Sequence, residues 1–253
     1  MVIRSILYNA EAYHEYSEKE IKQLESMQLS ILTGILELPR TTPYCALLME
    51  VGWWNMRARL AYQKMMLYHN IVRSDLKRPL KRILAAQEKE ERETTWFCSV
   101  QREIQRYGIE LDVKDTLKST WKREVKKKIN EKMEYELQEK CNNSKKSRIV
   151  KNDKFQKKEY LLGKVTLSDA KKILNTRMNM VKVPGNYKGK SDGNCPLCER
   201  EEGSTEHYFQ CVNVKQLVEV WNVTADDLSN QNIQKMKDVA NFMEKVQIMV
   251  NPG

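Results

Sequence analysis

Apolar residues recur every three or four positions over most of the chain, which is the spacing of one face of an α-helix. The clearest segment runs from Asp115 to Lys140, and its apolar positions are Leu117, Trp121, Val125, Ile129, Met133 and Leu137. Because four residues turn about 400°, this stripe shifts by about 40° per step and winds around the helix. We therefore expect it to pack against several helices while the intervening lysines face outward.

The same periodicity predicts further helices. One opens at Ser17, a candidate N-cap followed by early acidic residues, and stops at Pro39. The simplest cover for its apolar face is an αα-hairpin built across the turn at 38–43. Shorter helices are predicted at about Pro79–Glu91, Thr95–Tyr107, Leu167–Met180 and Asn232–Met249. We find no internal repeat and no convincing strand outside a cysteine-rich turn near residue 195.

Composition supports a helical protein without a membrane segment. The 253 residues include 9 Gly and 6 Pro, whereas average usage would give about 30 such residues together. No apolar run approaches the roughly 18 to 20 residues that span a bilayer, and Met1–Tyr8 lacks a signal-peptide core. We therefore expect an intracellular protein, nuclear and/or cytoplasmic, with no membrane partner.

The formal charge of +10 is concentrated in one stretch. Between Lys114 and Lys158 there are 16 basic residues and 7 acidic ones, a surplus of nine. Lysines placed against phosphates release condensed counterions, so this stretch predicts binding to RNA and/or DNA. The predicted contact residues are Lys122, Arg123, Lys126, Lys127, Lys145, Lys146, Arg148, Lys151 and Lys154, together with Arg177 of the next helix.

Aromatic side chains within and beside this stretch offer a second kind of contact. Trp121, Tyr135, Phe155 and Tyr160 could stack on bases. The alternative is a solvated basic face with Trp121 in the core.

Cys141–Ser147 is polar and basic without apolar periodicity, which predicts an exposed linker and a domain boundary. The organisation expected from these patterns is a helical domain at 1–110, a basic helix and exposed linker at 111–164, a connector helix at 165–191, a cysteine–histidine knuckle at 192–215 and a C-terminal helix at 216–253.

The strongest chemical motif has the form C-x2-C-x8-H-x3-C and comprises Cys195, Cys198, His207 and Cys211. Four such ligands satisfy tetrahedral zinc and leave no open position for water, so the motif predicts a structural zinc site. Ser204 or Thr205 could cap a short helix that presents His207 and Cys211 on one face. The alternative is a chance cluster of free thiols. The predicted fold is thus mainly α, a helical bundle with a basic helix and linker and a small CCHC zinc knuckle.

Other candidate sites have weak support. Cys45, Cys98 and Cys141 stand apart from the motif, and we expect Cys45 and Cys98 in the core. His14 and His69 have no catalytic context and are expected to pack or to lie at the surface. No phosphate-binding glycine loop is present, so no nucleotide cofactor is predicted.

Paired aspartates can hold the magnesium ions of a polymerase, but Asp226 and Asp227 follow Thr224-Ala225 and fit a capped helical turn better. The sequence predicts no catalytic residue and no enzyme.

Several segments together resemble the C-terminal part of the reverse transcriptase of non-LTR (LINE-type) retrotransposons. They comprise Tyr8–Tyr13, Leu24–Gln28, Ile35–Pro43, Leu47–Gly52, Ile173–Met178, and Cys195–Cys211 followed by Trp221. The first four are similar, in order and spacing, to the thumb and linker that follow the polymerase palm, and the last resembles the C-terminal CCHC knuckle. The resemblance is loosest between Leu80 and Leu161.

The resemblance implies a module that grips template RNA or target DNA while another segment or a polymerase-bearing protein performs the chemistry. The palm aspartates of that family have no counterpart here, and 42 residues after Cys211 are too few for an endonuclease domain. We therefore expect a non-catalytic nucleic-acid-binding protein with a structural zinc. The alternative is a zinc-stabilised helical module that binds another protein and makes no direct contact with nucleic acid.

Overall fold

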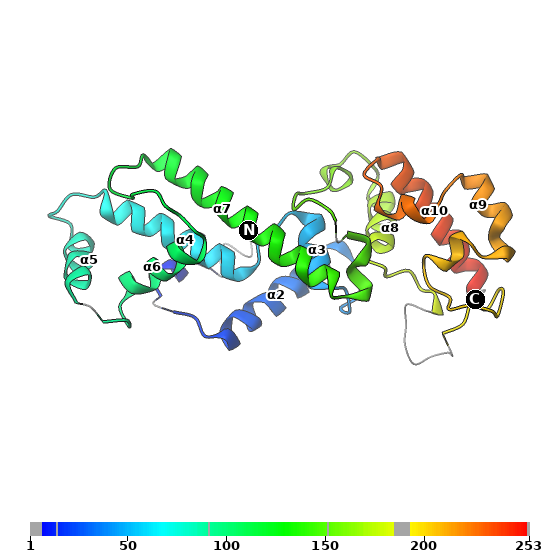
Figure 1. Ribbon diagram of the computed structural model, residues 1–253, viewed down its shortest axis with the longest axis horizontal. Helices are drawn as coiled ribbons and strands as arrows, with labels where there is room; N and C mark the ends of the chain where they lie inside the picture. The colour runs from blue at the N-terminus through cyan, green and yellow to red at the C-terminus, as the bar shows by residue number, and fades with distance from the viewer. Residues whose placement is uncertain (1–6, 14, 91, 151, 185–192, 252–253) are drawn as a thin grey trace. The chain divides into compact units, whose positions relative to one another are not determined.

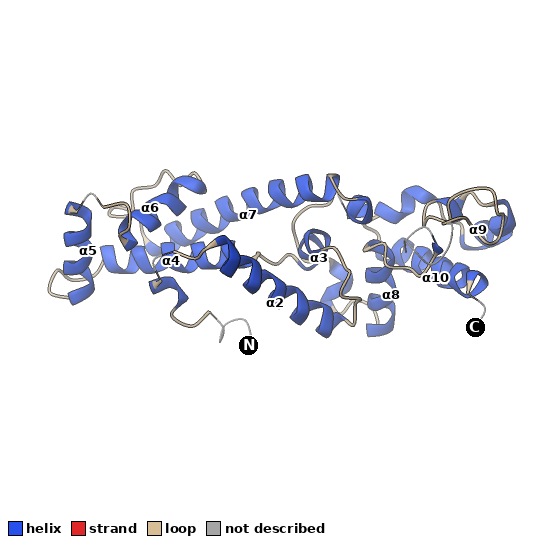
Figure 2. Ribbon diagram, turned by 90° about the horizontal axis from the view of Figure 1, so that it is seen from below, coloured by secondary structure: helices blue, strands red, loops and turns tan. Residues whose placement is uncertain are grey.

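The computed structural model describes residues 7–13, 15–90, 92–150, 152–184 and 193–251, without the side chains of Lys145, Lys146 and Arg148. Helices and loops make up these residues, and their only strand-like feature is an isolated antiparallel bridge between Asn194 and Glu202. Figures 1 and 2 show the helices along the chain. The α-helices are α2 (Glu18–Leu36), α3 (Tyr44–Val51), α4 (Met56–Val72), α5 (Pro79–Lys89), α6 (Trp96–Arg106), α7 (Lys118–Asn142), α8 (Leu167–Arg177), α9 (Lys215–Trp221) and α10 (Ile233–Val250).

The predicted helices are confirmed to within about three residues at most ends, because the capping residues act as their chemistry requires. The Ser17 backbone N–H donates to the Glu20 carboxylate at 2.8 Å while the Glu20 N–H donates to the Ser17 hydroxyl at 3.3 Å, which forms a capping box at the start of α2. The Thr95 hydroxyl accepts from the Cys98 N–H at 3.2 Å and starts α6. Gly108 has a positive φ just beyond α6.

The chain folds into two compact units, and the first comprises residues up to Ile31 together with 54–136. Within this unit α4 packs against α5, α6 and the 3-10 helix η1 (Ala10–Ala12). Trp121 of α7 is 1% exposed and donates its indole N–H to the Met65 carbonyl of α4 at 3.2 Å. His69 stacks on the Trp121 ring and bonds the Thr116 carbonyl oxygen at 2.9 Å. From Trp121 onward the winding apolar stripe of α7 is buried, as predicted.

The second unit comprises residues 32–53 and 137 onward. Its largest helix contact is between α8 and α10, and α10 also packs against α9 and the 3-10 helix η7 (Ala225–Ser229). Phe242 of α10 is completely buried, with its ring centroid 4.8 Å from that of Phe209, two residues before Cys211. The short helix α3 packs against the 3-10 helix η2 (Lys145–Val150).

Three sequence predictions about the fold are wrong. Leu117 precedes α7 and is exposed, so the buried stripe starts at Trp121. The turn at 38–43 leads into α3, an eight-residue helix that packs mainly on η2, in place of the αα-hairpin. The segment Cys141–Ser147 is not an exposed linker, because α7 continues to Asn142 and both Cys141 and Ser147 are completely buried. Cys141 lies four residues after Leu137 and continues the buried series of α7, although most of the residues that follow it are polar.

Candidate metal centre and basic helix

The cysteine-rich turn is a tight backbone reversal. The Cys195 N–H donates to the Glu201 carbonyl at 2.7 Å, and the Gly203 N–H donates to the Gly193 carbonyl at 2.8 Å. Gly193 has a φ of 84°, which a residue with a Cβ would adopt only with strain. A Cβ at Gly203 would lie 2.9 Å from the Tyr208 hydroxyl oxygen and 3.1 Å from the Cys195 Cα. Glycine at 203 therefore lets the backbone pass beside the first cysteine.

The four residues of the motif converge on one point. Their ligand atoms all lie within 4.8 Å of one another, with 3.9 Å between the sulfurs of Cys195 and Cys211 and 3.4 Å between the Cys198 sulfur and His207 Nε2. Tetrahedral zinc with Zn–S bonds of about 2.3 Å would place two sulfurs about 3.8 Å apart. The donor set therefore has the spacing that a bound metal ion requires, and these residues can bind one.

A neighbouring carboxylate orients the histidine. His207 Nδ1 lies 3.0 Å from the Glu201 carboxylate, so a proton on Nδ1 leaves Nε2 as the ligand atom that faces the cysteines. A carboxylate behind a metal-binding histidine fixes the tautomer and raises the basicity of the ligand nitrogen. Glu201 was not among the predicted site residues, although its place inside the motif is the signal that could have identified it.

The surroundings of the cysteines also shift the pKa values of their thiols. The N–H groups of Arg200 and Glu201 point at the Cys198 sulfur, Arg200 foremost, and help to lower the pKa of that thiol to about 7. Burial raises the pKa of Cys211 to about 11. Two of the sulfurs thus differ in how readily they lose a proton, and a cation placed between them would favour the thiolate form of both.

The predicted helix between His207 and Cys211 is wrong in form. A single 3-10 turn covers His207–Phe209, and Cys211 lies beyond it. The expected cap is present, because the Ser204 hydroxyl accepts from the His207 N–H at 3.2 Å. Thr205 instead donates its hydroxyl proton to the Asn179 side-chain oxygen at 2.5 Å, which joins the cysteine-rich segment to the residues after α8.

The predicted basic helix exposes its cations on one face of α7. Lys122, Arg123, Lys126 and Lys127 are all exposed and line a shallow groove together with Ser119 and Asn130. Within the described part of the chain, Lys122, Arg123 and Lys126 form no ion pair, whereas Lys127 lies 4.0 Å from Glu131. Glu131 and Glu134 line the groove farther along the helix, so the positive charge is concentrated over its first three turns.

The other predicted contact residues have mixed positions. Lys154 is exposed, Lys151 lies outside the described residues, and the side chains of Lys145, Lys146 and Arg148 are likewise not described. Tyr135 is 68% exposed and free to stack on a base, and Phe155 is half-buried. Trp121 and Tyr160 are each 1% exposed, so neither ring is open to stack on a base, and Trp121 lies in the core, which was the alternative.

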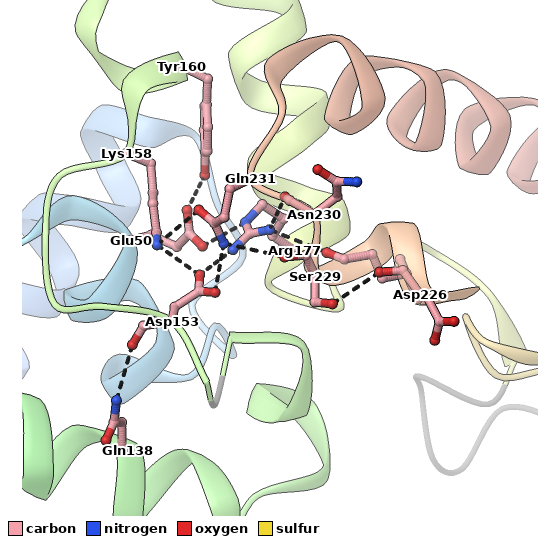
Figure 3. Close-up of polar contacts among 11 residues, drawn as sticks. Glu50, Gln138, Asp153, Lys158, Tyr160, Arg177, Asp226, Ser229, Asn230 and Gln231 are labelled. Atoms are coloured by element: carbon pink, nitrogen blue, oxygen red, sulfur yellow. Dashed lines mark hydrogen bonds and ion pairs between the residues drawn. The ribbon is translucent and has the colours of Figure 1, made fainter. Parts of the chain in front are cut away.

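Arg177 is also not a nucleic-acid contact, because it is 2% exposed at the centre of a buried charge network in the second unit (Figure 3). Its guanidinium donates to the Glu50 carboxylate at 2.7 Å, pairs closely with Asp153, and reaches the carbonyls of Leu228 and Asn230 at 3.3 Å. A guanidinium has five donors, and four of them are used in this almost completely buried site. Arg177 is therefore structural.

The network contains two anions and two cations. Lys158 is 4% exposed and lies 3.0 Å from Asp153, and the Tyr160 hydroxyl donates to the other oxygen of Glu50 at 2.5 Å. Burial would lower the pKa of Arg177, but Glu50 and Asp153 outweigh it and raise that pKa. Sequence analysis missed this network, although a single glutamate in the otherwise apolar helix α3 signals a buried partner.

Asp226 and Asp227 occupy a capped turn, as predicted. The Asp227 carboxylate accepts from the Thr224 N–H at 2.9 Å and from its hydroxyl at 3.1 Å, while the Thr224 side chain completes a capping box. His69 packs on Trp121 as expected, and His14 lies outside the described residues. Cys45 and Cys98 are half-buried, so their predicted place in the core is wrong.

Two further findings bear on what this chain is. Within the part of the chain that the structure describes, no helix is both long enough and apolar enough to cross a membrane. No protein-family model matches the sequence, and neither a curated protein nor a solved structure matches the chain.

Proposed function

We propose that this chain is a non-catalytic protein that binds RNA and/or DNA through the basic face of α7, and that a structural zinc ion holds its knuckle. The observation that carries the proposal is the exposed set Lys122, Arg123, Lys126 and Lys127, of which the first three form no ion pair within the described chain. A protein gains little stability from unpaired surface cations, so their clustering on one helix favours a role in binding an anionic partner.

Phosphate contacts explain why the charge lies on a rigid element. Positions 122, 123, 126 and 127 share one side of α7, because i and i+4 neighbours lie about 40° apart around a helix. Each lysine or arginine that neutralises a phosphate contributes roughly 0.7 to 0.9 to the slope of log K against log salt. Four such residues give sequence-independent affinity.

Zinc is the metal that the donor set favours. Three thiolates and one imidazole are soft or borderline ligands, and a tetrahedral site filled by protein groups has no open position for catalysis. When bound, zinc would cross-link Cys195, Cys198, His207 and Cys211 and thereby stabilise the fold around residues 193–211.

The resemblance to the C-terminal part of a non-LTR retrotransposon reverse transcriptase supports the same proposal. In that setting the chain would hold template RNA or target DNA for a polymerase-bearing protein. The order of the resembling segments and the CCHC spacing are what support this assignment.

Fluorescence anisotropy with single-stranded RNA, duplex RNA and duplex DNA of equal length tests the proposal. We expect measurable binding to at least one of them at 100 mM salt, with affinity that falls steeply by 300 mM. A triple variant, Lys122→Gln/Arg123→Gln/Lys126→Gln, should bind at least tenfold more weakly. No binding to any of the three at 50 mM salt would refute the proposal.

One observation favours a second candidate, a protein-interaction module. Val212 and Val220 are 64% and 79% exposed beside the knuckle, and exposed aliphatic side chains of this kind often contact another protein. A stable complex with a protein partner whose affinity is the same at 50 and 500 mM salt, together with absent nucleic-acid binding, would favour this candidate.

A further inference from the structure

Two cysteines far apart in the sequence meet in the second unit. Cys45 is the second residue of α3, and Cys141 lies in the last turn of α7. The two side chains are within hydrogen-bonding reach of each other, and the Ser147 hydroxyl lies 3.5 Å from the Cys45 sulfur. Cys45 is half-buried, whereas Cys141 is completely buried. Cys45 is thus the more exposed residue of the pair.

The surroundings of Cys45 favour its thiolate. The sulfur receives a hydrogen bond from the Cys141 thiol, and the Ser147 hydroxyl lies 3.5 Å from it. The backbone N–H groups of Ala46 and of Cys45 itself also point at the sulfur. Free N–H groups in the first turn of a helix stabilise a negative charge. The hydrogen bond from the Cys141 thiol contributes most to lowering the pKa of Cys45, which falls to about 6 although burial acts in the opposite direction.

The same contact keeps Cys141 protonated. The hydrogen bond that it donates to Cys45 raises the pKa of Cys141, and burial raises it further. The pair therefore consists of a half-exposed thiolate and a buried thiol at its side. This is the division of roles between an attacking and a resolving cysteine.

We propose that Cys45 and Cys141 form a peroxide-sensitive thiol pair, in which Cys45 is oxidised first and Cys141 then resolves it to an intramolecular disulfide. In the first step the Cys45 thiolate attacks hydrogen peroxide, an S–O bond forms, the O–O bond breaks, and hydroxide leaves. In the second step the Cys141 sulfur attacks the Cys45 sulfenic acid, the S–O bond breaks, and the Cys141 proton leaves with the hydroxyl group as water. Peroxide is reduced by two electrons and the two thiols are oxidised by two.

The disulfide would tie the N-terminus of α3 to the last turn of α7. Both segments belong to the second unit, and α3 also carries Glu50 of the buried charge network. Oxidation would therefore add a covalent link beside that network. The proposal is independent of nucleic-acid binding, because none of its residues belongs to the basic face of α7.

The chain contains a matched control in Cys98. This residue is also half-buried and in the first turn of a helix, where its N–H donates to the Thr95 cap. It is the only cysteine of the first unit, so that unit offers it no partner thiol. Cys45 and Cys98 thus differ in the neighbouring thiol more than in exposure or place along a helix.

The first test measures alkylation of the zinc-loaded full chain at pH 6 by iodoacetamide and quantitative peptide mass spectrometry. At this pH a thiol of pKa about 6 is half ionised, against about 0.3% for an ordinary thiol of pKa about 8.5. The lower nucleophilicity of the more acidic thiolate removes about tenfold of this advantage. We therefore expect Cys45 to react roughly tenfold faster than a free model thiol, and faster than Cys98. A Cys45 rate at or below that of Cys98 would overturn the proposal.

The second test follows oxidation by one equivalent of hydrogen peroxide. Non-reducing digestion should give a peptide pair linked through Cys45 and Cys141, with zinc still bound as judged by a chromogenic chelator. In Cys141→Ser, a dimedone adduct should instead accumulate on Cys45, whereas Cys45→Ser should leave Cys141 unmodified. Oxidation of Cys98 or loss of zinc before any Cys45–Cys141 link would contradict the proposal, as would a Cys141→Ser protein that folds but forms no adduct.

Discussion

Replacing Arg177 with methionine tests whether this arginine stabilises the fold or contacts nucleic acid. The variant keeps the aliphatic volume but removes the guanidinium that touches Glu50 and Asp153. Both carboxylates are almost completely buried, and only Lys158 would remain to balance them. Breaking a buried ion network by removing one partner costs about 3 to 5 kcal/mol, because a charge is left without compensation. That is a large share of the roughly 5 to 15 kcal/mol that stabilises an ordinary domain.

The measurement is urea unfolding followed by circular dichroism, with Arg123→Met of the exposed face as the matched control. We expect Arg177→Met to lose about 3 to 5 kcal/mol. Arg123→Met should lose less than about 0.5 kcal/mol, since surface substitutions have small effects. Among molecules that remain folded, RNA affinity should fall for Arg123→Met and stay unchanged for Arg177→Met. Unfolding of Arg177→Met within 1 kcal/mol of the wild type, or a selective loss of its RNA binding, would refute the structural assignment.

Three further predictions follow from the geometry. Gly52→Ala should destabilise the second unit by about 2 kcal/mol or more, since φ is +60° and a Cβ would lie 2.3 Å from the Lys157 backbone nitrogen. In the same urea assay, Gly108→Ala should cost only about 1 kcal/mol, because its φ is also +60° but the space around its Cβ is open. Equal costs for the two variants would contradict the steric argument. Chelation of zinc, or Cys198→Ser, should raise amide hydrogen exchange around 194–221 but not in α4; unchanged exchange in the knuckle would show that no metal supports it. Metal binding requires thiolates, and the pKa of Cys198 is lowered only to about 7. Zinc affinity measured by competition should therefore fall by at least about tenfold per pH unit below pH 7. A pH-independent affinity would argue against thiolate ligation.

Helix positions were predictable because their signals are local. The caps at Ser17 and Thr95 and the positive φ at Gly108 each depend on a few neighbouring residues, and the structure shows all three. The cluster of four residues that could bind a metal ion was predictable for the same reason, because 17 consecutive residues contain them all.

What could not be predicted depends on contacts between distant segments. In the sequence nothing distinguishes Arg177 from other basic residues. Its buried position depends on Glu50, which lies 127 positions earlier in the chain. The segment at Cys141–Ser147 has the composition of an exposed linker, yet Cys141 and Ser147 pack beside Cys45 of α3. Charge and polarity alone therefore indicated the wrong surroundings for both, since burial of a polar group is decided by its partners.

The salt dependence of nucleic-acid binding tests the central claim most directly. The triple variant Lys122→Gln/Arg123→Gln/Lys126→Gln is compared with Lys19→Gln/Lys22→Gln/Lys245→Gln, which removes the same formal charge from exposed positions on α2 and α10. If the face on α7 contacts phosphates, the first variant should flatten the slope of log K against log salt by about 2 to 3 units, and the control by less than about one. Equal slopes for both variants and the wild type would contradict the claim that this face binds the nucleic-acid backbone.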